Sequence, residues 1–583
     1  MNRTHTLLIL LALCLSLLAA CGDSNHPHPP DTSSPLINET ETPVRDIAIV
    51  QDGVANYTVV RPENANQNTI DAAVLVAQSI KEYTGIFPKI STDWTKRGEE
   101  PDAAAHEILI GNTLHPESAQ ALEGIPYGDY IITAIGNKIV INAWSQPALD
   151  RAISEFTVQL IKTASDGSFS LPSNIRMTGT DSETANALPF YEGGTFSTVY
   201  HAGDDNQLLL IRDTTREAYD AYCAKLVKEG FSLYTENEIT DNKFATYITD
   251  DYVINAGYYD YATESRIIIE PRSTLPALSA DNQYTKVMDP SFAMLGLEYM
   301  YEEELAQNGL CFIWQLADGS YIIADGGFNR ARDAKALYDY MYKHAPDKNN
   351  ITIAAWIFTH SHGDHSGAYF AFSETYANRV TLECVIGNFP SDEAREEGGL
   401  GTEGNLGHKI MKYLDNYQDA EFIKTHVGHK FYIRDAEIEI LYTLESFAPG
   451  VLSYFNTSSL IFTMKIGGQQ FLILGDASND ACTITSQMYG DYLKSDIIHA
   501  AHHGYTTGSS AYQGVTAVYD LAASPVVLWP LGALDYAGMN TRAQSLHLQE
   551  LGTTKEIFVA GSRDIRFTLP YTVGTSGYES IIK

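Results

Sequence analysis

Four side chains that bind divalent metals well lie within six residues of one another, from His360 to His365. The segment Thr359–His365 has the sequence THSHGDH and follows the apolar run Ile351–Phe358, which predicts a buried strand. Residues two apart in an extended chain point to the same side, so His360 and His362 can face one ion. Imidazole and carboxylate groups gathered at a strand end favour a divalent metal site over an ordinary polar loop.

Other strands must bring further ligands to this place. The sequence predicts short apolar strands that end at, or lead into, Asp325, Asp476 and the pair His502-His503. These strands cover Cys311–Leu316, Tyr321–Asp325, Ala436–Tyr442, Gln470–Gly475 and Asp496–His499. Taken alone, Asp476 could equally cap a following helix, so its assignment depends on the histidine-rich segment.

The motif HxHxDH resembles the signature of the metallo-β-lactamase superfamily, and the resemblance extends over about Asn282–Lys583, half of the chain. It implies an αββα sandwich with a dinuclear metal site at the strand edges. The segment from Asp496 to Gly504, which ends in His-His-Gly, is similar to the competence-protein-like and phosphorylcholine-esterase-like branches. Asn456, with the Thr-Ser-Ser that follows it, resembles the same branches.

The resemblance also implies a role for each site residue. His360 and His362 are expected to bind the first metal, and Asp364 with His365 the second. Asp476 is expected to bridge the two metals, and His503 to complete the second site. Asp325 is expected to orient a metal-bound histidine. The expected catalytic residues are Asp364 and His502, the latter as a hydrogen-bond donor to the leaving group or oxyanion.

One position departs from the family pattern. The remaining histidine of the first site normally follows the strand that corresponds to Ala436–Tyr442, but Leu444 stands there and cannot bind a metal. Glu445, His426 or His429 could substitute. A carboxylate ligand would make the first site harder and more tolerant of Mn²⁺ or Fe²⁺.

The expected chemistry is hydrolysis, with two divalent metals, Zn²⁺ in the first place and Mn²⁺ or Fe²⁺ as alternatives, activating a hydroxide. The His-His-Gly segment and Asn456 favour a phosphodiester on a small molecule or cell-surface polymer. A carboxyl ester or lactone stays open as the bond cleaved. Another alternative is a surface glycan-binding lipoprotein whose metal site is structural or degenerate.

The length and the charge of the chain limit its domain organisation and its possible partners. The chain has 583 residues, of which 44% are hydrophobic, so two or three folded domains are expected. Its 38 Lys+Arg and 73 Asp+Glu give a formal charge of −35. Because such a surface repels phosphate backbones, we expect no general nucleic-acid binding.

The N-terminal residues predict that the protein is located outside the cytoplasm. Residues 1–20 contain the apolar run Leu7–Leu18 and read as a signal peptide that is too short to span a membrane. Leu18-Ala19-Ala20-Cys21 resembles the bacterial lipobox, which implies cleavage before Cys21, its acylation and a cell membrane lipoprotein. Residues 21–45 are rich in Pro, Ser, Thr and Asn, and predict a flexible tether.

Two smaller domains are expected before the metal-binding one. Residues 46–185 predict an α/β domain with a helix from Thr69 to Thr84, a hairpin turn at Gly136-Asn137 and a last helix from Pro147 to about Ile161. Its order resembles the accessory domain that precedes the barrel of some glycoside hydrolases. Residues 186–281 predict an α+β module with one helix at about Arg216–Glu229, and residues 282–583 form the hydrolase domain. The fold class is therefore multidomain α/β and α+β.

Overall fold

The computed structural model describes residues 46–200, 206–297, 299–301, 305–307, 309–401, 406–505, 513–561, 563–578 and 580–582. The signal peptide, Cys21 and the tether lie outside these residues. Asp46–Lys583 forms one compact unit by its internal contacts. Among the described residues, no helix combines the length and the apolar character that crossing a membrane requires.

The first sheet belongs to an α/β fold. Its strands lie in the order β4 (Ile90–Thr92), β3 (Thr58–Arg61), β5 (Glu107–Ile110), β7 (Lys138–Ala143), β6 (Asp129–Ile135) and β9 (Arg176–Thr180). A separate small sheet pairs β2 (Val54–Ala55), β1 (Asp46–Gln51) and β8 (Phe169–Pro172). Strands β4, β3, β5 and β7 are parallel, and β6 and β7 form the expected hairpin through Gly136-Asn137.

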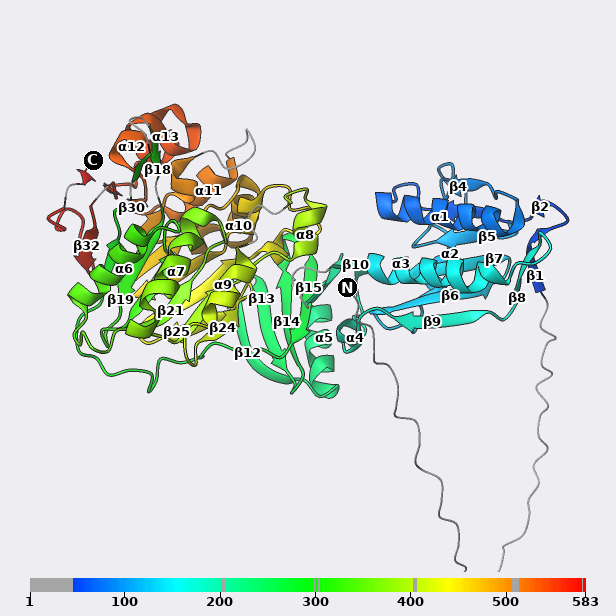
Figure 1. The fold of residues 1–583 in the computed structure, drawn as a ribbon, viewed down its shortest axis with the longest axis horizontal. Coiled ribbons are helices and arrows are strands. Elements are labelled where there is room, and N and C mark those ends of the chain that lie inside the picture. Colours follow the sequence, from blue (N-terminus) through cyan, green and yellow to red (C-terminus); the bar gives the residue numbers. More distant parts are fainter. Residues whose placement is uncertain are drawn as a thin grey trace, which may run out of the picture. The chain divides into compact units, whose positions relative to one another are not determined.

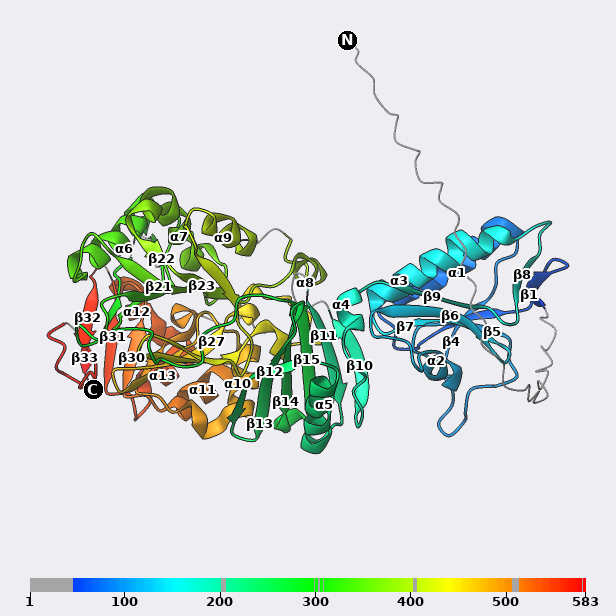
Figure 2. The same ribbon diagram turned by 90° about the horizontal axis from the view of Figure 1, so that it is seen from below.

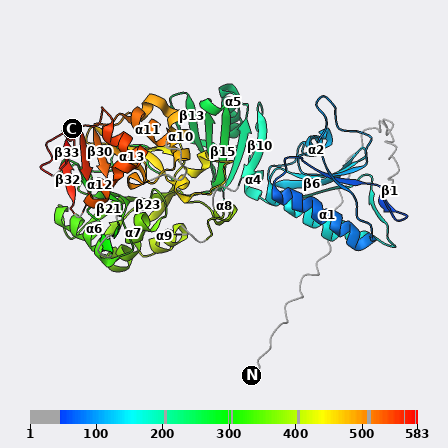
Figure 3. The same cartoon turned by 90° about the horizontal axis from the view of Figure 1, so that it is seen from above.

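Helices cover both faces of this first sheet (Figure 3). Helix α1 (Gln67–Thr84) begins after the Asn66 cap, whose side chain accepts from the Thr69 amide, and ends at Gly85, which takes the left-handed conformation expected of a stop signal. It packs Ala73 and Val76 on one face of the sheet, while α2 (Pro116–Ala121) packs on the other.

The last helix of this part is shorter than the sequence predicts. Helix α3 (Gln146–Glu155) gives way to a π-helical turn, η1 (Phe156–Leu160), and a short 3₁₀ turn, η2 (Ile161–Thr163). The Thr157 hydroxyl donates to the Ile153 carbonyl at 2.9 Å, inside this transition. A hydroxyl that bonds the preceding turn competes with the regular helical ladder, which offers a reason for the change.

The second sheet is antiparallel throughout. Its order is β10 (Thr195–Tyr200), β11 (Gln207–Arg212), β15 (Glu264–Pro271), β14 (Tyr252–Tyr259), β13 (Asn242–Ile248) and β12 (Ser232–Ile239). Helix α5 (Arg216–Lys228) lies on one face through Tyr219, Tyr222 and Leu226. The sequence analysis had not identified β10 or β12. Ile239, Phe244 and Tyr259 join the apolar cluster of the following domain, so this sheet packs directly against it.

Two eight-stranded sheets make up the C-terminal half. One sheet runs β24 (Glu421–Lys424), β23 (Cys384–Gly387), β21 (Thr352–Ile357), β20 (Tyr321–Asp325), β19 (Cys311–Gln315), β16 (Ser291–Met294) and β32 (Ile565–Thr568), with β22 (Thr381–Leu382) beside β21. The other runs β25 (Lys430–Ile433), β26 (Ala436–Tyr442), β27 (Ile461–Ile466), β28 (Gln469–Ile473), β29 (Ile497–His499), β30 (Val526–Trp529), β31 (Glu556–Val559) and β33 (Ile581–Ile582).

These sheets stack face to face and are covered by helices on their outer sides (Figures 1 and 2). Trp314 of one sheet and Phe471 of the other meet in the core between them, with ring centroids 5.5 Å apart. Helices α6 (Ala331–His344), α7 (Gly363–Tyr376) and α9 (Gly407–Leu414) cover the first sheet. Helices α10 (Asn479–Tyr489), α11 (Gln513–Ala522) and α13 (Ala543–Glu550) cover the second. The expected αββα sandwich is confirmed.

Candidate metal centre

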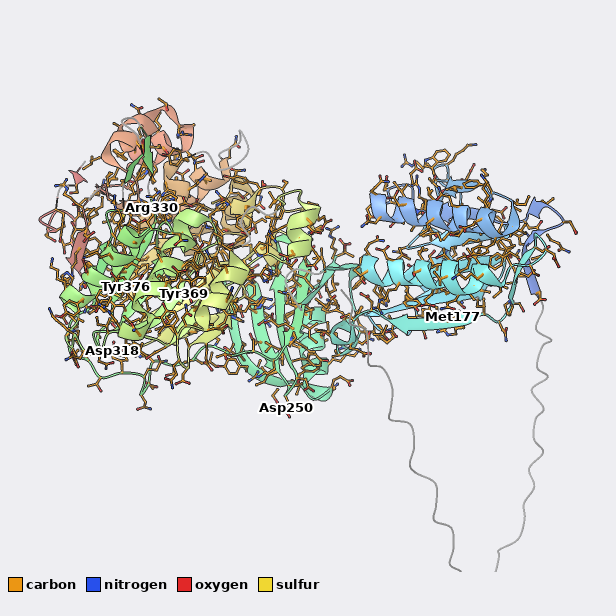
Figure 4. All side chains as sticks on the ribbon, in the orientation of Figure 1. Met177, Asp250, Asp318, Arg330, Tyr369 and Tyr376 are labelled. Carbon is orange, nitrogen blue, oxygen red and sulfur yellow. The ribbon has the colours of Figure 1, made fainter. Side chains whose placement is uncertain are left out.

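The histidine-rich segment connects β21 to α7 at one edge of the sandwich. His360 follows the strand, His362 is the cap residue of α7, and Asp364 and His365 lie in its first turn. Figure 4 labels Tyr369 and Tyr376 on the same helix. Tyr369 is buried with its ring edge-on to Trp356, at 5.0 Å, which fixes the helix on its strand. Because the helix starts within the motif, the strand end and the first helical turn bring the four side chains to the same edge of the sandwich.

The ligand atoms of the predicted site residues form two groups. One group consists of His360, His362 and Asp476; the other consists of Asp364, His365, Asp476 and His503. Within each group the ligand atoms lie within 4.8 Å of one another. Asp476 belongs to both groups, the place that the resemblance gives to a bridging ligand.

In the first group, His360 presents Nε2 to its neighbours. This atom lies 3.0 Å from Nδ1 of His362 and 3.9 Å from Oδ2 of Asp476. Its other nitrogen, Nδ1, is 3.1 Å from the Thr359 hydroxyl, which holds the ring in place. Burial, followed by the proximity of His365, lowers the pKa of His360 well below its usual value. A neutral imidazole has the free electron pair that a metal needs.

In the second group, hydrogen bonds fix the tautomers of both histidines. Nδ1 of His365 lies 2.8 Å from Oδ2 of Asp325, and Nδ1 of His503 lies 2.8 Å from the Pro530 carbonyl oxygen. When Nδ1 donates in each case, Nε2 is left to face the centre. His365 Nε2 is 3.1 Å from Oδ1 of Asp476, and His503 Nε2 is 3.6 Å from Oδ2 of Asp364.

Asp325 contacts His365, which is the contact that the expected orienting role requires. It is fully buried at the end of β20 and takes a left-handed backbone conformation, with φ of 56°. Its carboxylate accepts from the Thr359 amide at 2.9 Å and the Thr359 hydroxyl at 2.8 Å, in addition to His365. One carboxylate thus fixes both the strand end and a ligand ring.

The turn that carries His502 and His503 is strained. Both residues have left-handed φ values, 50° and 51°, and Gly504 follows with φ of 85°. Non-glycine residues hold this conformation only where the surroundings enforce it, often at functional sites. The Trp529 indole donates to the His503 carbonyl at 2.8 Å, and the His502 amide donates to the Gly475 carbonyl at 3.1 Å.

His502 occupies a different position from His503. Its Nε2 lies 3.7 Å from Oδ2 of Asp476, and its side chain keeps 22% of its surface exposed, against 4% for His503. His503 therefore belongs to the buried group of ligand atoms, whereas His502 lies beside Asp476 and stays partly accessible to solvent. The ligand role expected for His503 and the catalytic role expected for His502 stay predictions.

None of the three proposed substitutes for the missing histidine reaches the first group. Glu445 is buried, and its Oε1 accepts from Asn388 Nδ2 at 2.7 Å and lies 3.3 Å from Nδ1 of His426. His426 also contacts Glu270 at 3.1 Å, and His429 contacts Asn255 at 2.8 Å. These residues form a second buried polar cluster between the sandwich and the preceding sheet.

The donor set fits divalent cations. Asp476 Oδ1 is buried and accepts no hydrogen bond from a described group, although His365 Nε2 faces it. Burial opposes a charge on His365, but the carboxylates of Asp476, Asp364 and Asp325 outweigh it and raise the pKa of His365 well above its usual value, so a bound cation would take the place of the proton on Nε2. Histidine and aspartate in this arrangement are zinc-type ligands.

Two aromatic residues complete the wall of the site, and the sequence analysis had not identified them. The Phe455 ring lies 4.8 Å from the His362 ring. The Tyr454 hydroxyl accepts from Asn456 Nδ2 at 3.1 Å, and burial together with Asp476 raises the pKa of Tyr454 to about 12. Only the resemblance at Asn456 pointed to this segment.

Comparison with known protein families shows where a similar sandwich, with candidate metal ligands at its strand ends, occurs. Residues 307–510 match the family model of the metallo-beta-lactamase superfamily. The C-terminal domain is similar to that superfamily over these residues. No curated protein matched the chain.

Three solved structures illustrate the similarity. The metallo-beta-lactamase fold protein YhfI from Bacillus subtilis is 13% identical with a TM-score of 0.32, covering 48% of this chain and 100% of its own. CmlA, a diiron beta-hydroxylase from Streptomyces venezuelae, is 13% identical with a TM-score of 0.30, covering 49% and 55%. Zn²⁺-bound PqqB from Methylobacterium extorquens is 8% identical with a TM-score of 0.31, covering 48% and 100%.

Proposed function

We propose that the chain is a metal-dependent hydrolase that cleaves an ester bond, in the first place a phosphodiester. The observation that carries this proposal is the pair of His/Asp groups that share Asp476. Two divalent metals, Zn²⁺ or else Mn²⁺ or Fe²⁺, would be held by these groups and would supply Lewis acidity and a water ionised near neutral pH.

The chain's own residues orient the reactants and move the proton. Asp325 and the Pro530 carbonyl hold the rings of His365 and His503 with Nε2 directed inward. His502, which stays partly accessible beside Asp476, can donate from Nε2 to the leaving oxygen of a bound ester. The Tyr454 hydroxyl, neutral at physiological pH, can donate a hydrogen bond to a substrate oxygen on the same side as Asp476.

Residue patterns favour a phosphodiester over the alternatives. The His-His-Gly turn and Asn456 are the features that resemble the phosphorylcholine-esterase-like branch; His503 of the turn belongs to the second group of ligands, and Asn456 donates to the Tyr454 hydroxyl. The charge of −35 disfavours a long polyanion as substrate. A small molecule, a lipid headgroup or a cell-surface polymer with isolated phosphodiesters fits better. A carboxyl ester or a lactone is the competing substrate class.

The test combines metal analysis with a substrate panel. The purified protein is assayed on bis(p-nitrophenyl) phosphate, p-nitrophenyl phosphorylcholine and a lactone, beside the variant Asp364→Ala/His365→Ala. Asp339→Ala is the matched control, because Asp339 is an exposed acid on α6 paired only with Lys335 in the described residues. We expect phosphodiester cleavage that the double variant loses and the control keeps. Cleavage of the lactone alone would assign the other ester class, and inert protein would refute hydrolysis.

We also propose a location outside the cytoplasm, through a lipid attached to Cys21. The apolar run Leu7–Leu18 and the sequence Leu18-Ala19-Ala20-Cys21 support it. The variant Cys21→Ser should shift the protein from the membrane fraction to the soluble extracytoplasmic fraction. Mass spectrometry should find an acylated N-terminal cysteine in the unaltered chain. An unmodified Cys21 in membrane-free protein would contradict the proposal.

A further inference from the structure

A cavity of about 480 Å³ opens in the first α/β fold, away from the metal centre. It lies where the parallel strands β3, β5 and β7 end, beside the first turns of α1 and α3, and it is also lined by Phe196 and Ser197 of β10; all of these elements except β3 are labelled in Figure 1. The crevice beyond the carboxyl ends of parallel strands is the usual ligand site of open α/β sheets. Its volume falls within the range of pockets that hold small molecules, about 300–1,000 Å³.

The chemistry of the lining is unusual for so acidic a chain. None of the described residues that line the cavity is charged, although the chain carries a formal charge of −35. Five side-chain amides and one indole line it instead, together with small and apolar residues. These are Asn64, Asn66, Asn112, Asn142, Gln146 and Trp144.

Several of these groups are held in fixed orientations. Asn142 is fully buried; its Nδ2 donates to the Ser118 carbonyl and its Oδ1 accepts from the Ala143 amide, both at 2.9 Å. The Trp144 indole donates to the Ile125 carbonyl at 2.7 Å, and its ring stands edge-on to Tyr127, at 5.5 Å, and to Phe196, at 4.7 Å, which also lines the cavity. The ring is therefore a rigid, half-buried aromatic surface rather than a mobile side chain.

The rim offers unused hydrogen-bonding capacity. Asn64 and Asn112 are exposed, and neither side chain has a hydrogen-bond partner among the described residues. Each amide can donate twice and accept at its oxygen. A sugar hydroxyl likewise both donates and accepts, so amides and hydroxyls match without a charge on either side.

We propose that this cavity binds a neutral carbohydrate ring. The ring packs an apolar face on Trp144 and exchanges hydrogen bonds with Asn64 and Asn112 at the rim. A nucleotide or other polyphosphate is disfavoured because no lysine or arginine is among the lining residues. A purely apolar ligand is disfavoured because it would displace water from the Asn64 and Asn112 amides at the rim without replacing its hydrogen bonds. This site gives the chain a sugar-recognition function independent of hydrolysis.

The experiment measures binding with the full protein by saturation-transfer NMR. The probes are methyl β-D-glucopyranoside, methyl β-D-galactopyranoside, N-acetylglucosamine and cellobiose, each at about 10 mM, which saturates a site with a Kd near 1 mM. Inorganic phosphate is the competitor. The test variant is Asn64→Ala/Asn112→Ala, which changes exposed residues only. The matched control is Asn350→Ala, an exposed asparagine in the loop before β21.

We expect at least one sugar to receive saturation, the double variant to weaken its binding tenfold or more, and Asn350→Ala to leave it unchanged. A second variant, Ala65→Trp, fills the cavity from its edge and should abolish the signal while ester hydrolysis stays at its original rate. No transfer to any of the four sugars would overturn the proposal. Equal binding by the double variant, or displacement of the sugar by phosphate, would also overturn it.

Discussion

The buried cluster between the sandwich and the second sheet makes a quantitative prediction about stability. Glu270 lies 3.1 Å from Nε2 of His426 through one carboxylate oxygen and 2.9 Å from the Lys424 ammonium through the other. Glu445 approaches His426 from the far side, at 3.3 Å. Burial opposes a charge on His426, but the two carboxylates outweigh it and raise the pKa of His426 from 6.5 to about 9.

The perturbation is Glu270→Gln, which keeps the shape and removes the charge. A pKa difference between 6.5 and about 9 corresponds to about 3 kcal/mol of stabilisation. The lowered pKa of Glu270, about 2, reflects largely the same pair and is not added to it. Glu445 still faces His426 in the variant, so only part of this shift is lost, while the broken contact with Lys424 adds to the loss. We therefore expect the variant to lose about 3 kcal/mol of unfolding free energy at pH 6, the lower end for a broken buried pair.

The loss of unfolding free energy in the Glu270→Gln variant should be larger at low pH than at high pH. Because the folded-state pKa of His426 is raised, its stabilisation is complete below pH 6.5 and disappears as the pH rises through about 9. His429, next to His426, stays uncharged throughout, since burial followed by His426 lowers its pKa to about 3. At pH 9.5, where most of the charge on His426 is gone, the difference in unfolding free energy between wild type and variant should be clearly smaller than at pH 6.

The assay is denaturant unfolding at pH 6.0 and 9.5, followed by circular dichroism. Glu238→Gln is the matched control: the same substitution on an exposed acid of the same sheet, 2.8 Å from Arg216. An exposed pair of this kind is worth about 0–1 kcal/mol. A Glu270→Gln variant as stable as the control at pH 6, or a deficit that grows toward pH 9.5, would refute the reasoning.

Three further predictions concern the metal centre. Asp325→Asn should weaken metal binding about 10- to 100-fold, because His365 loses its orienting partner, as judged by metal content after dialysis against a chelator; unchanged content would contradict this. His502→Ala should keep the metal content and lower kcat by about 100-fold or more. His503→Ala, in contrast, should lose one metal. Equal metal content in the two variants would refute the separate roles of His502 and His503. Gly504→Ala should lower the Tm of the protein, because φ is 85° and an added Cβ would lie 2.6 Å from the Trp529 ring. Gly538→Ala, where nothing lies within 4 Å, should not, and equal effects would argue against strain at Gly504.

The sequence predicted the parts of this molecule that depend on local signals. The Asn66 and Gly85 positions delimit α1 because capping and left-handed turns act within a few residues. The HxHxDH segment places four potential metal ligands on one strand-to-helix turn. Metal binding could therefore be predicted there without knowledge of the fold. Asp325, Asp476 and His503 were identifiable because each stands at the end of an apolar strand, and the family resemblance gave each a role.

The remaining features depend on contacts between distant residues. Glu270 and His426 are 156 positions apart, and no local pattern indicates that Glu445 binds His426 and Asn388 instead of turning toward the metal ligands. Phe455 packs on His362 across a similarly long separation. The end of α3 was misjudged because Thr157 bonds back to Ile153, an interaction that composition does not reveal.

The central claim is that Asp476 joins two metal sites into one centre, and metal analysis tests it most directly. Elemental analysis of the purified protein, combined with hydrolysis of bis(p-nitrophenyl) phosphate, is compared between the unaltered chain and Asp476→Ala. The account predicts two divalent metals per chain in the former, and one or none with hydrolysis lost in the latter. Metal-free wild-type protein, or a variant that keeps both metals and its full rate, would contradict it.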